Sequence, residues 1–421
     1  MQNNGGSDAA ARPKTALILT GGGARAAYQA GVLSALSHLL PRGSPTPFPV
    51  ICGTSAGSVN ATVLAVDAAN FRFAVRRLVA VWNNFHVDHV YRADLYGALR
   101  NSARWVLAAL TRGRFLTRRP ISLLDNAPLA ALLLRHINFA AIQRQIDAGH
   151  LDALSITCSG YSSGHSVSFY QGRPELRNWQ RARRIGVAMP IGLNHLLASS
   201  ALPFIFPPTH INREYFGDGS MRQTAPISPA IHLGADRVLV IGAARLALGT
   251  LHADHTGSQY LYPALAQIAG HAMASIFLDA LAGDIERLRR VNSTLALIPE
   301  AERARSGLRP VELLVIAPSR RLDTLATPYV KGLPRTVRTI LRVLGATGRR
   351  GSGLASYLLF ERRYTRRLIE LGRCDALERA DEVRRFFGLE SRPAPASPDI
   401  QVATPDIQVA RPATQVATPA T

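Results

Sequence analysis

The sequence predicts an α/β fold in which helices cover a mostly parallel central sheet. Two observations lead to this prediction. Near the N-terminus, short apolar segments alternate with helix-like segments, which is typical of parallel strands joined by helices. The chain of 421 residues is 47% hydrophobic and only 18% charged, so it holds enough apolar material for one large core.

Two strand–helix pairs open the pattern. Residues Thr15–Thr20 (TALILT) form the first predicted strand, and a helix follows three glycines, at about Ala24–Leu40. Residues Val50–Thr54 form the second strand, and a second helix covers about Ala56–Ala68. Because each apolar strand leads into a helix, the two strands are expected to lie parallel in one sheet.

Long helices and scattered strands are predicted for the remainder. Residues 70–150 are mostly helical, and a long helical stretch at 259–291 is broken or bent near Gly270 or Gly283. The further strand candidates are Ala153–Cys158, Ser166–Tyr170, Arg237–Ile241, Leu295–Ile298 and Val311–Ile316.

A serine lies where the second predicted strand meets its helix. The segment CGTSAG places Ser55 between Gly53 and Gly57, which matches the G-x-S-x-G pattern of a nucleophile on a tight strand-to-helix turn. Such a turn strains the backbone at the serine and needs neighbours with almost no side chain. The dipole of the following helix favours negative charge there. An ordinary Gly-Ser turn is the alternative.

A glycine run follows the first predicted strand. Gly21, Gly22 and Gly23 could donate backbone N–H groups to an oxyanion, since glycine lets such donors approach a tetrahedral carbon closely. The same stretch matches the G-x-G-x-x-A fingerprint of a dinucleotide-binding loop. That alternative lacks its acidic residue, because no Asp or Glu lies between residues 8 and 67, and it would need Arg42 for an NADP phosphate.

Asp218 is the candidate base for such a serine. The segment YFGDGS places it between Gly217 and Gly219, where a carboxylate can approach a hydroxyl closely, although an Asp-Gly hairpin turn is the alternative. No histidine after Ser55 lies in a turn-rich motif behind a late strand. An unperturbed Asp has a pKa of about 3.9, so burial in a closed apolar pocket has to raise it for this role.

Four motifs occur in one order along the chain. They are GGGARAAYQAGVL, GTSAGSVNA, ASSALPFIFPP and DGS. Together they resemble the patatin-like phospholipase family over roughly residues 15–245. The resemblance implies a patatin-like three-layer α/β sandwich and a Ser–Asp dyad without histidine, in which Ser55 is the nucleophile and Asp218 the base.

The resemblance also implies roles for the glycine loop and its neighbours. Gly21, Gly22 and Gly23 would form the oxyanion hole. The supporting positions are Arg25, Gly53, Gly57 and Gly219. From the residues alone, Arg25 could hold the loop, pair with a phosphate or lie on a helix surface.

The function that the resemblance implies is hydrolysis of acyl esters in lipids. A phospholipase A or lysophospholipase-type reaction would pass through an acyl-enzyme, with a phospholipid or another acyl-ester lipid as substrate. No metal or organic cofactor is expected. The alternative is a catalytically inert, basic membrane- or nucleic-acid-binding protein on the same fold, and specific nucleic-acid binding is not favoured because aromatic residues do not alternate with the basic runs.

Four regions are expected along the chain. Residues 1–13 form a flexible leader, 14–245 the patatin-like catalytic domain, and 246–390 a mainly helical extension that completes or caps the core. Residues 391–421 form a disordered, Pro-rich tail in which PDIQVAT recurs as PDIQVAR and PATQVAT. Proline in every seven-residue unit excludes a coiled coil.

Charge and cysteine content bear on the expected location. The net charge of +21 favours attraction to a polyanion such as an anionic membrane surface. The three cysteines, Cys52, Cys158 and Cys374, lack the spacing of a metal site or disulfide framework, which favours a reducing compartment. With no secretory signal and no run of about 20 apolar residues, a cytoplasmic protein is expected, peripheral on the inner face of the membrane.

Two acid-free basic stretches are candidate membrane contacts. In the first, six arginines surround Trp105, Leu107 and Leu110. They are Arg100, Arg104, Arg112, Arg114, Arg118 and Arg119. In the second, basic residues fall on one face of a predicted helix and apolar residues on another, as in a helix that binds an anionic membrane. The basic residues are Lys331, Arg335, Arg338 and Arg342, and the apolar residues are Val337, Ile340, Leu341 and Leu344.

Overall fold

A computed structural model of the protein describes residues 13–91, 122, 124–245, 265–343 and 352–389. The proline-rich tail, all but one residue of the expected leader, and the arginine stretch at 100–119 lie outside the described residues. So does Leu344.

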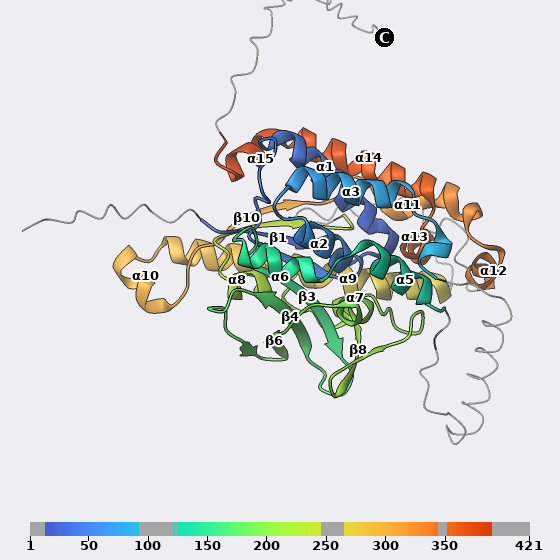
Figure 1. Ribbon diagram of the computed structural model, residues 1–421, viewed down its shortest axis with the longest axis horizontal. Helices are drawn as coiled ribbons and strands as arrows, with labels where there is room; N and C mark the ends of the chain where they lie inside the picture. Colours follow the sequence, from blue (N-terminus) through green and yellow to red (C-terminus); the bar gives the residue numbers. More distant parts are fainter. Residues whose placement is uncertain (1–12, 92–121, 123, 246–264, 344–351, 390–421) are drawn as a thin grey trace, which may run out of the picture.

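A ten-stranded mixed sheet forms the centre of the described chain (Figure 1). Its strand order is β10-β9-β1-β2-β3-β4-β6-β5, and β8 pairs with β3 and with β7. The five strands from β10 to β3 are all parallel: Glu312–Ile316 (β10), Arg237–Ile241 (β9), Thr15–Leu19 (β1), Val50–Thr54 (β2) and Ala153–Gly160 (β3). The remaining strands are Ser166–Gly172 (β4), Trp179–Arg181 (β5), Arg184–Ala188 (β6), Thr209–Ile211 (β7) and Glu214–Asp218 (β8).

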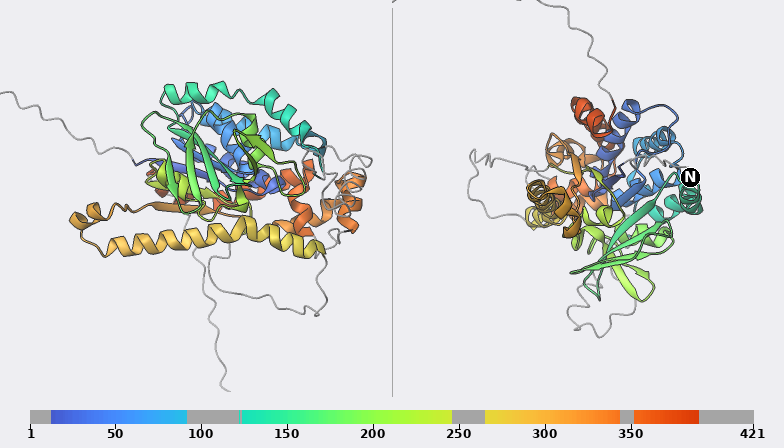
Figure 2. Two further views of the ribbon diagram at one scale, coloured as in Figure 1. Left: turned by 90° about the horizontal axis from the view of Figure 1, so that it is seen from below. Right: turned by 90° about the vertical axis from the view of Figure 1, so that its left-hand side faces the viewer.

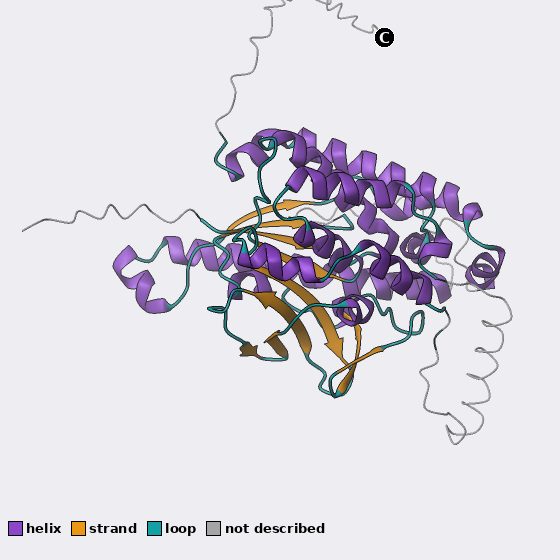
Figure 3. Ribbon diagram, viewed as in Figure 1, coloured by secondary structure: helices purple, strands orange, loops and turns teal. Residues whose placement is uncertain are grey.

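Helices cover the two faces of the parallel part, and Figure 3 shows the strands between them. One face packs against four helices: Ala27–Leu39 (α1), Ala56–Val66 (α2), Phe71–Asn83 (α3) and Arg362–Glu378 (α14). The other packs against two: Ser228–His232 (α8) and Leu265–Ala296 (α9). Along β1 the buried side chains alternate, with Leu17 and Leu19 facing α1 and Ala16 and Ile18 facing α8 and α9. The predicted α/β class with a mostly parallel sheet is therefore confirmed.

The other helices lie around this sandwich. Figure 2 shows α9 on the opposite side of the molecule from α5 and α6. Their bounds are Ala127–His136 (α5), Ala140–Asp147 (α6), Leu193–Ser199 (α7), Glu300–Ser306 (α10), Leu322–Ala326 (α11), Arg335–Val343 (α12), Ser352–Leu358 (α13) and Ala380–Phe386 (α15). Short 3₁₀ turns cover Gly23–Ala26, Val87–His89, Gly219–Met221 and Thr327–Gly332. None of the helices in the described ranges has the length and apolar content needed to cross a bilayer.

The strand register brings distant segments to one edge of the sheet. Leu19 of β1 pairs with Gly53 of β2, and Thr54 pairs with Thr157 of β3. The glycine run and Ser55 therefore leave neighbouring parallel strands at the same edge. On β3, Cys158 pairs with Asp218 of the antiparallel strand β8, which carries that aspartate to the same place.

Helix α14, near the C-terminal end of the described chain, packs against α1 with almost no space between the backbones. A Cβ added to Gly372 would lie 2.2 Å from the Tyr28 carbonyl oxygen, and one added to Gly31 would lie 2.0 Å from the Ile369 carbonyl oxygen. The Tyr28 hydroxyl also donates to Asp375 at 2.8 Å. The C-terminal segment is therefore part of the same core as the first strand–helix unit.

Two predictions differ from the structure, and four strands lie outside the predicted set. Residues Leu295–Ile298 are no strand, because α9 continues to Ala296 and a turn follows. The same helix passes through Gly270 and Gly283 without a break. The strands β5 to β8 were not predicted from the sequence.

The predicted basic helix begins later than its pattern indicates. Lys331 lies in the 3₁₀ turn before it, and α12 begins only at Arg335. Val337 and Leu341 are buried, so this part of the predicted apolar face packs onto the protein core, whereas the side chain of Ile340 lies outside the described residues. Arg335 and Arg342 remain exposed.

Candidate active site

Ser55 occupies a strained turn between β2 and α2. Its backbone has φ 55° and ψ −131°, a conformation that residues other than glycine rarely adopt. The turn closes tightly, because a Cβ on Gly57 would lie 2.2 Å from the Leu19 carbonyl oxygen and one on Gly53 would lie 2.6 Å from the Gly57 carbonyl oxygen. Only glycine fits at these two positions, and the turn therefore presents the serine at the N-terminus of α2.

The Ser55 hydroxyl and the Asp218 carboxylate meet at this edge of the sheet. Ser55 Oγ donates to Asp218 Oδ2 at 2.6 Å, and the Ser220 backbone N–H donates to Asp218 Oδ1 at 2.9 Å. The two side chains are almost completely buried, with Ser55 2% exposed and Asp218 0% exposed. A Cβ on Gly219 would lie 2.1 Å from the Thr157 carbonyl oxygen, so this glycine lets the loop close onto β3.

Burial changes the acidity of Asp218. Removal from water raises the pKa of Asp218 to about 6, although the hydrogen bonds from Ser55 and Ser220 act in the opposite direction. At neutral pH the group is still mostly a carboxylate, and it is a better base than an unperturbed aspartate. The chemistry of a Ser–Asp pair needs this shift.

Ser199 supports the turn from α7. The Ser55 backbone N–H donates to Ser199 Oγ at 2.9 Å, and Ser199 Oγ donates to the Thr157 carbonyl at 2.7 Å. The side chain is completely buried. Sequence reasoning missed this residue, which lies in the ASSALPF motif next to Ser200 and carries no signal that separates the two serines.

The glycine loop lies beside Ser55 and leaves its N–H groups available. In the part of the chain that the structure describes, no group accepts a hydrogen bond from the backbone N–H of Gly21, Gly22 or Gly23. Gly23 has φ 54°, and a Cβ there would lie 2.3 Å from the Tyr357 carbonyl oxygen. Gly23 and Ser55 line the same pocket. Donors of this kind can bind an oxyanion.

Arg25 fastens the glycine loop to the C-terminal part of the chain. Its guanidinium donates to Ser356 Oγ at 2.6 and 2.8 Å, to the Tyr357 hydroxyl at 3.1 Å and to the Gly353 carbonyl at 3.2 Å. It also lies 3.9 Å from the centre of the Tyr357 ring. Of the three readings of Arg25, the structure favours the loop anchor, because the side chain is buried rather than on a helix surface.

A buried polar chain holds the same loop from the other side. Gln29 Nε2 donates to the Thr20 carbonyl at 2.8 Å, just before the glycines. Asn60 Nδ2 donates to Gln29 Oε1 at 2.9 Å and to the Ala26 carbonyl at 3.2 Å, just after them. Gln29 and Asn60 are completely buried, so both ends of the loop are fixed. Both residues lie inside the sequence motifs, but only their spatial partners reveal this role.

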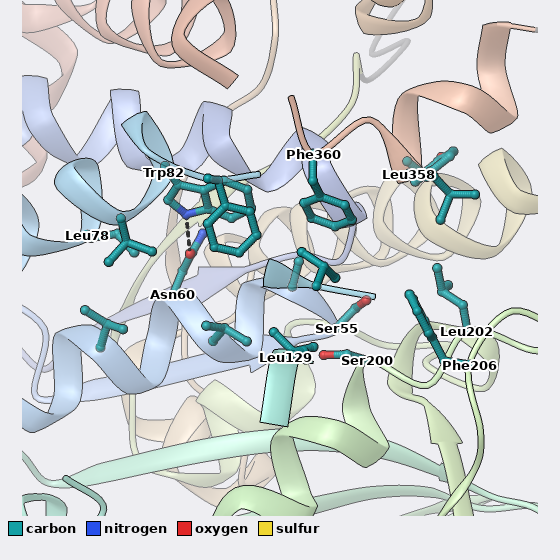
Figure 4. Close-up of a pocket in the computed structure, with 18 residues that line it drawn as sticks. Ser55, Asn60, Leu78, Trp82, Leu129, Ser200, Leu202, Phe206, Leu358 and Phe360 are labelled. Carbon is teal, nitrogen blue, oxygen red and sulfur yellow. Dashed lines mark hydrogen bonds between the residues drawn. The ribbon is translucent and has the colours of Figure 1, made fainter. Parts of the chain in front are cut away.

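An apolar pocket opens at Ser55 (Figure 4). Its volume is about 70 Å³, and nearly all of its walls are hydrocarbon. Besides Gly23 and Ser55, the lining residues come from α2, α3 and the segment after it, α5, the ASSALPFIFPP motif and the residues around α13. Leu202 and Phe206 belong to the ASSALPFIFPP motif, so this motif forms part of the pocket wall.

In the structure, Arg42 lies too far from the glycine loop to bind the phosphate of a dinucleotide held there. Arg42 follows the C-terminus of α1, whereas the glycines precede its N-terminus, and 13 helical residues separate them by about 20 Å. Across the described ranges, no histidine forms a hydrogen bond with Ser55 or Asp218, and no three His, Cys, Asp or Glu side chains are grouped as metal ligands would be.

Comparison with known proteins gives one family match. The family model described as patatin-like phospholipase matches residues 17–231, just over half of the chain. Among curated proteins, none matches this sequence significantly.

Two solved structures show a weak likeness. VipD from Legionella pneumophila is 12% identical with a TM-score of 0.30, and the match covers 88% of this chain and 67% of VipD. The complex of SpcU with ExoU from the type III secretion system of Pseudomonas aeruginosa gives 15% identity and a TM-score of 0.24, over 82% of this chain and 70% of the matched chain. Scores this low support no inference about the present protein.

Proposed function

Because the chain belongs to the patatin-like phospholipase family, we propose that it is a serine lipid acyl hydrolase with Ser55 as nucleophile and Asp218 as base. The observation that carries this proposal is the 2.6 Å hydrogen bond from Ser55 Oγ to Asp218 Oδ2, in a buried site at the end of an apolar pocket. The substrate is a phospholipid, a lysophospholipid or another acyl-ester lipid.

The reaction proceeds in two steps through an acyl-enzyme. Ser55 Oγ attacks the acyl carbonyl carbon while Asp218 accepts the hydroxyl proton. The tetrahedral intermediate collapses, the ester C–O bond breaks, and Asp218 returns the proton to the leaving alcohol. A water molecule then repeats the attack on the acyl-enzyme, with Asp218 again as base, and releases the fatty acid and free Ser55.

The glycine loop stabilises the oxyanion in both steps. The N–H of Ser55 is already bound to Ser199, so it cannot serve as a donor without breaking that bond. The unused N–H groups of Gly21–Gly23 remain, and one such donor typically lowers the barrier by about 2.7–4 kcal/mol. The dipole of α2 adds positive potential at the same point.

Single substitutions of the pair test the proposal. Release of fatty acid from phospholipid and lysophospholipid vesicles should fall by at least about 10³-fold in Ser55→Ala and Asp218→Asn. A fluorophosphonate should add one covalent label to the native chain, detected by intact mass, and none to Ser55→Ala. The exposed residues Ser163 and Asp147 provide matched controls, Ser163→Ala and Asp147→Asn.

Turnover that survives Ser55→Ala would contradict the proposal. If the native protein binds anionic vesicles but cleaves no ester and takes no label, the inert membrane-binding alternative would hold instead.

A further inference from the structure

The pocket continues from Ser55 along one face of α2. Val59 and Val63 line it at successive helical turns, and from Ser55 to Val63 the helix rises about 12 Å. Leu78 and Trp82 lie on one side of Ser55, whereas Leu202, Phe206 and Leu358 lie on the other (Figure 4). We call the first side the inner arm. We define it by six of the pocket residues that α2 and α3 supply: Val59, Asn60, Val63, Leu78, Val81 and Trp82.

The inner arm offers no polar partner to a ligand. Asn60 is its only polar amide, and both ends of that amide are occupied by Trp82, Gln29 and the Ala26 carbonyl. The other walls are aliphatic or aromatic. A charged or hydroxylated group would lose its hydration here without replacement, at a considerable cost in free energy.

Trp82 is held in a single orientation within this arm. Its indole N–H donates to Asn60 Oδ1 at 2.9 Å, and its ring stacks on Phe85 with the centroids 4.9 Å apart. The backbone carbonyl of Trp82 accepts a hydrogen bond from Thr365 of α14 at 2.9 Å. The side chain is 4% exposed, so the indole forms a rigid wall rather than a mobile one.

We propose that the inner arm binds the acyl chain of the substrate as one unbranched hydrocarbon chain, and that Trp82 limits its length. This inference rests on the proposed function, because Ser55 supplies the ester end of the chain. A cavity of about 70 Å³ is far smaller than the several hundred Å³ of a typical ligand pocket, so it admits a slender chain and excludes rings and branches. The limit falls where the chain reaches Trp82, which is hydrogen-bonded to Asn60, five residues or about 7.5 Å along α2 from Ser55.

A series of p-nitrophenyl esters with unbranched acyl chains measures this limit. In the native enzyme, kcat/KM should rise about fourfold with each added methylene and then stop rising once the chain fills the arm. Trp82→Ala removes the wall and should raise kcat/KM at least tenfold for the first ester beyond the native limit. Val63→Phe fills the arm and should move the limit to shorter chains.

Trp179→Ala is the matched control. Trp179 stacks on Tyr170 at the far edge of the sheet and does not line the pocket, so the same substitution there should leave the chain-length limit unchanged. A limit that moves in neither Trp82→Ala nor Val63→Phe overturns the inference, as does an equal shift in Trp179→Ala. Circular dichroism melts identify a variant that fails to fold, and the remaining variant then decides.

Binding to the Ser55→Ala protein separates this inference from the proposed function. Calorimetric affinities for unbranched fatty acids should rise about fourfold per methylene and level off at the length seen with the esters. Such binding without any ester turnover by the native protein would contradict the proposed function and support the inner arm. If the native protein turns over esters at a rate that does not depend on chain length, the proposed function would be supported and the role of the inner arm contradicted.

Discussion

At the scale of single residues, the site depends on a carboxylate that the fold keeps away from water. As the proposed base, Asp218 has to be deprotonated, and burial raises its pKa to about 6. We therefore expect kcat/KM to be level above about pH 7 and to fall about tenfold per pH unit below pH 6. A pH–rate profile on a soluble ester measures this. A profile that stays level down to pH 4.5 would contradict the role of Asp218.

Ser199 tests whether the strained turn has to be anchored. Ser199→Ala leaves the Ser55 N–H without its buried acceptor, which typically costs about 1–3 kcal/mol. We expect kcat to fall about 5- to 150-fold with little change in KM, because the loss concerns the position of the nucleophile and not the binding of substrate. Ser200→Ala removes the adjacent hydroxyl. This hydroxyl forms no hydrogen bond with Ser55, so the variant should have a smaller effect on kcat. Equal losses in the two variants would show that Ser199 has no special role.

At the scale of elements, the contact between α1 and α14 makes a clear prediction. A Cβ on Gly372 would meet the Tyr28 carbonyl oxygen at 2.2 Å, so Gly372→Ala forces the helices apart and should lower the free energy of unfolding by about 1–3 kcal/mol. Gly283 also lies inside a helix, but nothing is found within 4 Å of an added Cβ there. Gly283→Ala should therefore stabilise the protein by up to about 1 kcal/mol. Urea unfolding measures the change in the free energy of unfolding in both variants. A change of the same sign in the two variants would contradict this packing.

The helix α12 makes a separate prediction about membranes. Val337 and Leu341 on its apolar face are buried, so we expect charge to attract α12 to a lipid surface, and Arg335 and Arg342 are exposed cations on it. Each of Arg335→Glu and Arg342→Glu should weaken binding to phosphatidylserine-containing vesicles at least about fivefold at low salt. Arg366 is exposed on α14, and Arg366→Glu is the control for net charge. An equal loss in the control would mean that total charge, and not α12, determines binding.

The elements also show where sequence patterns are informative. Parallel strands buried on both faces are apolar throughout, so the sequence located β1, β2 and β9 to within one residue. The segment Leu295–Ile298 is equally apolar, but a run this short is compatible with a helix as well as a strand. The strands β5 to β8 are short and partly exposed, and only pairing with their neighbours defines them.

At the scale of the whole molecule, the C-terminal part of the chain completes the site and the core. It supplies β10 to the sheet, α14 to α1, and the residues around α13 that cover the glycine loop and the pocket. We expect a chain cut after residue 245 to show no cooperative thermal transition, because the apolar faces left behind would be exposed to water. Circular dichroism melts test this. A cooperative transition within about 5 °C of the full chain would establish 14–245 as an independent domain.

The sequence by itself determined the α/β class, the family, and the pair of residues to examine first. The glycines around Ser55 and Asp218 identify tight turns in the sequence, because such turns exclude side chains. This requirement involves only residues that are neighbours along the chain. The tertiary structure alone decided that Ser55 and Asp218 share a hydrogen bond, that Asp218 loses its water, and that Arg25, Gln29, Asn60 and Ser199 hold the glycine loop and the turn. These properties depend on groups that come from a stretch of more than 300 residues of chain and meet only in the fold. A motif of neighbouring residues cannot show which distant residues will be in contact.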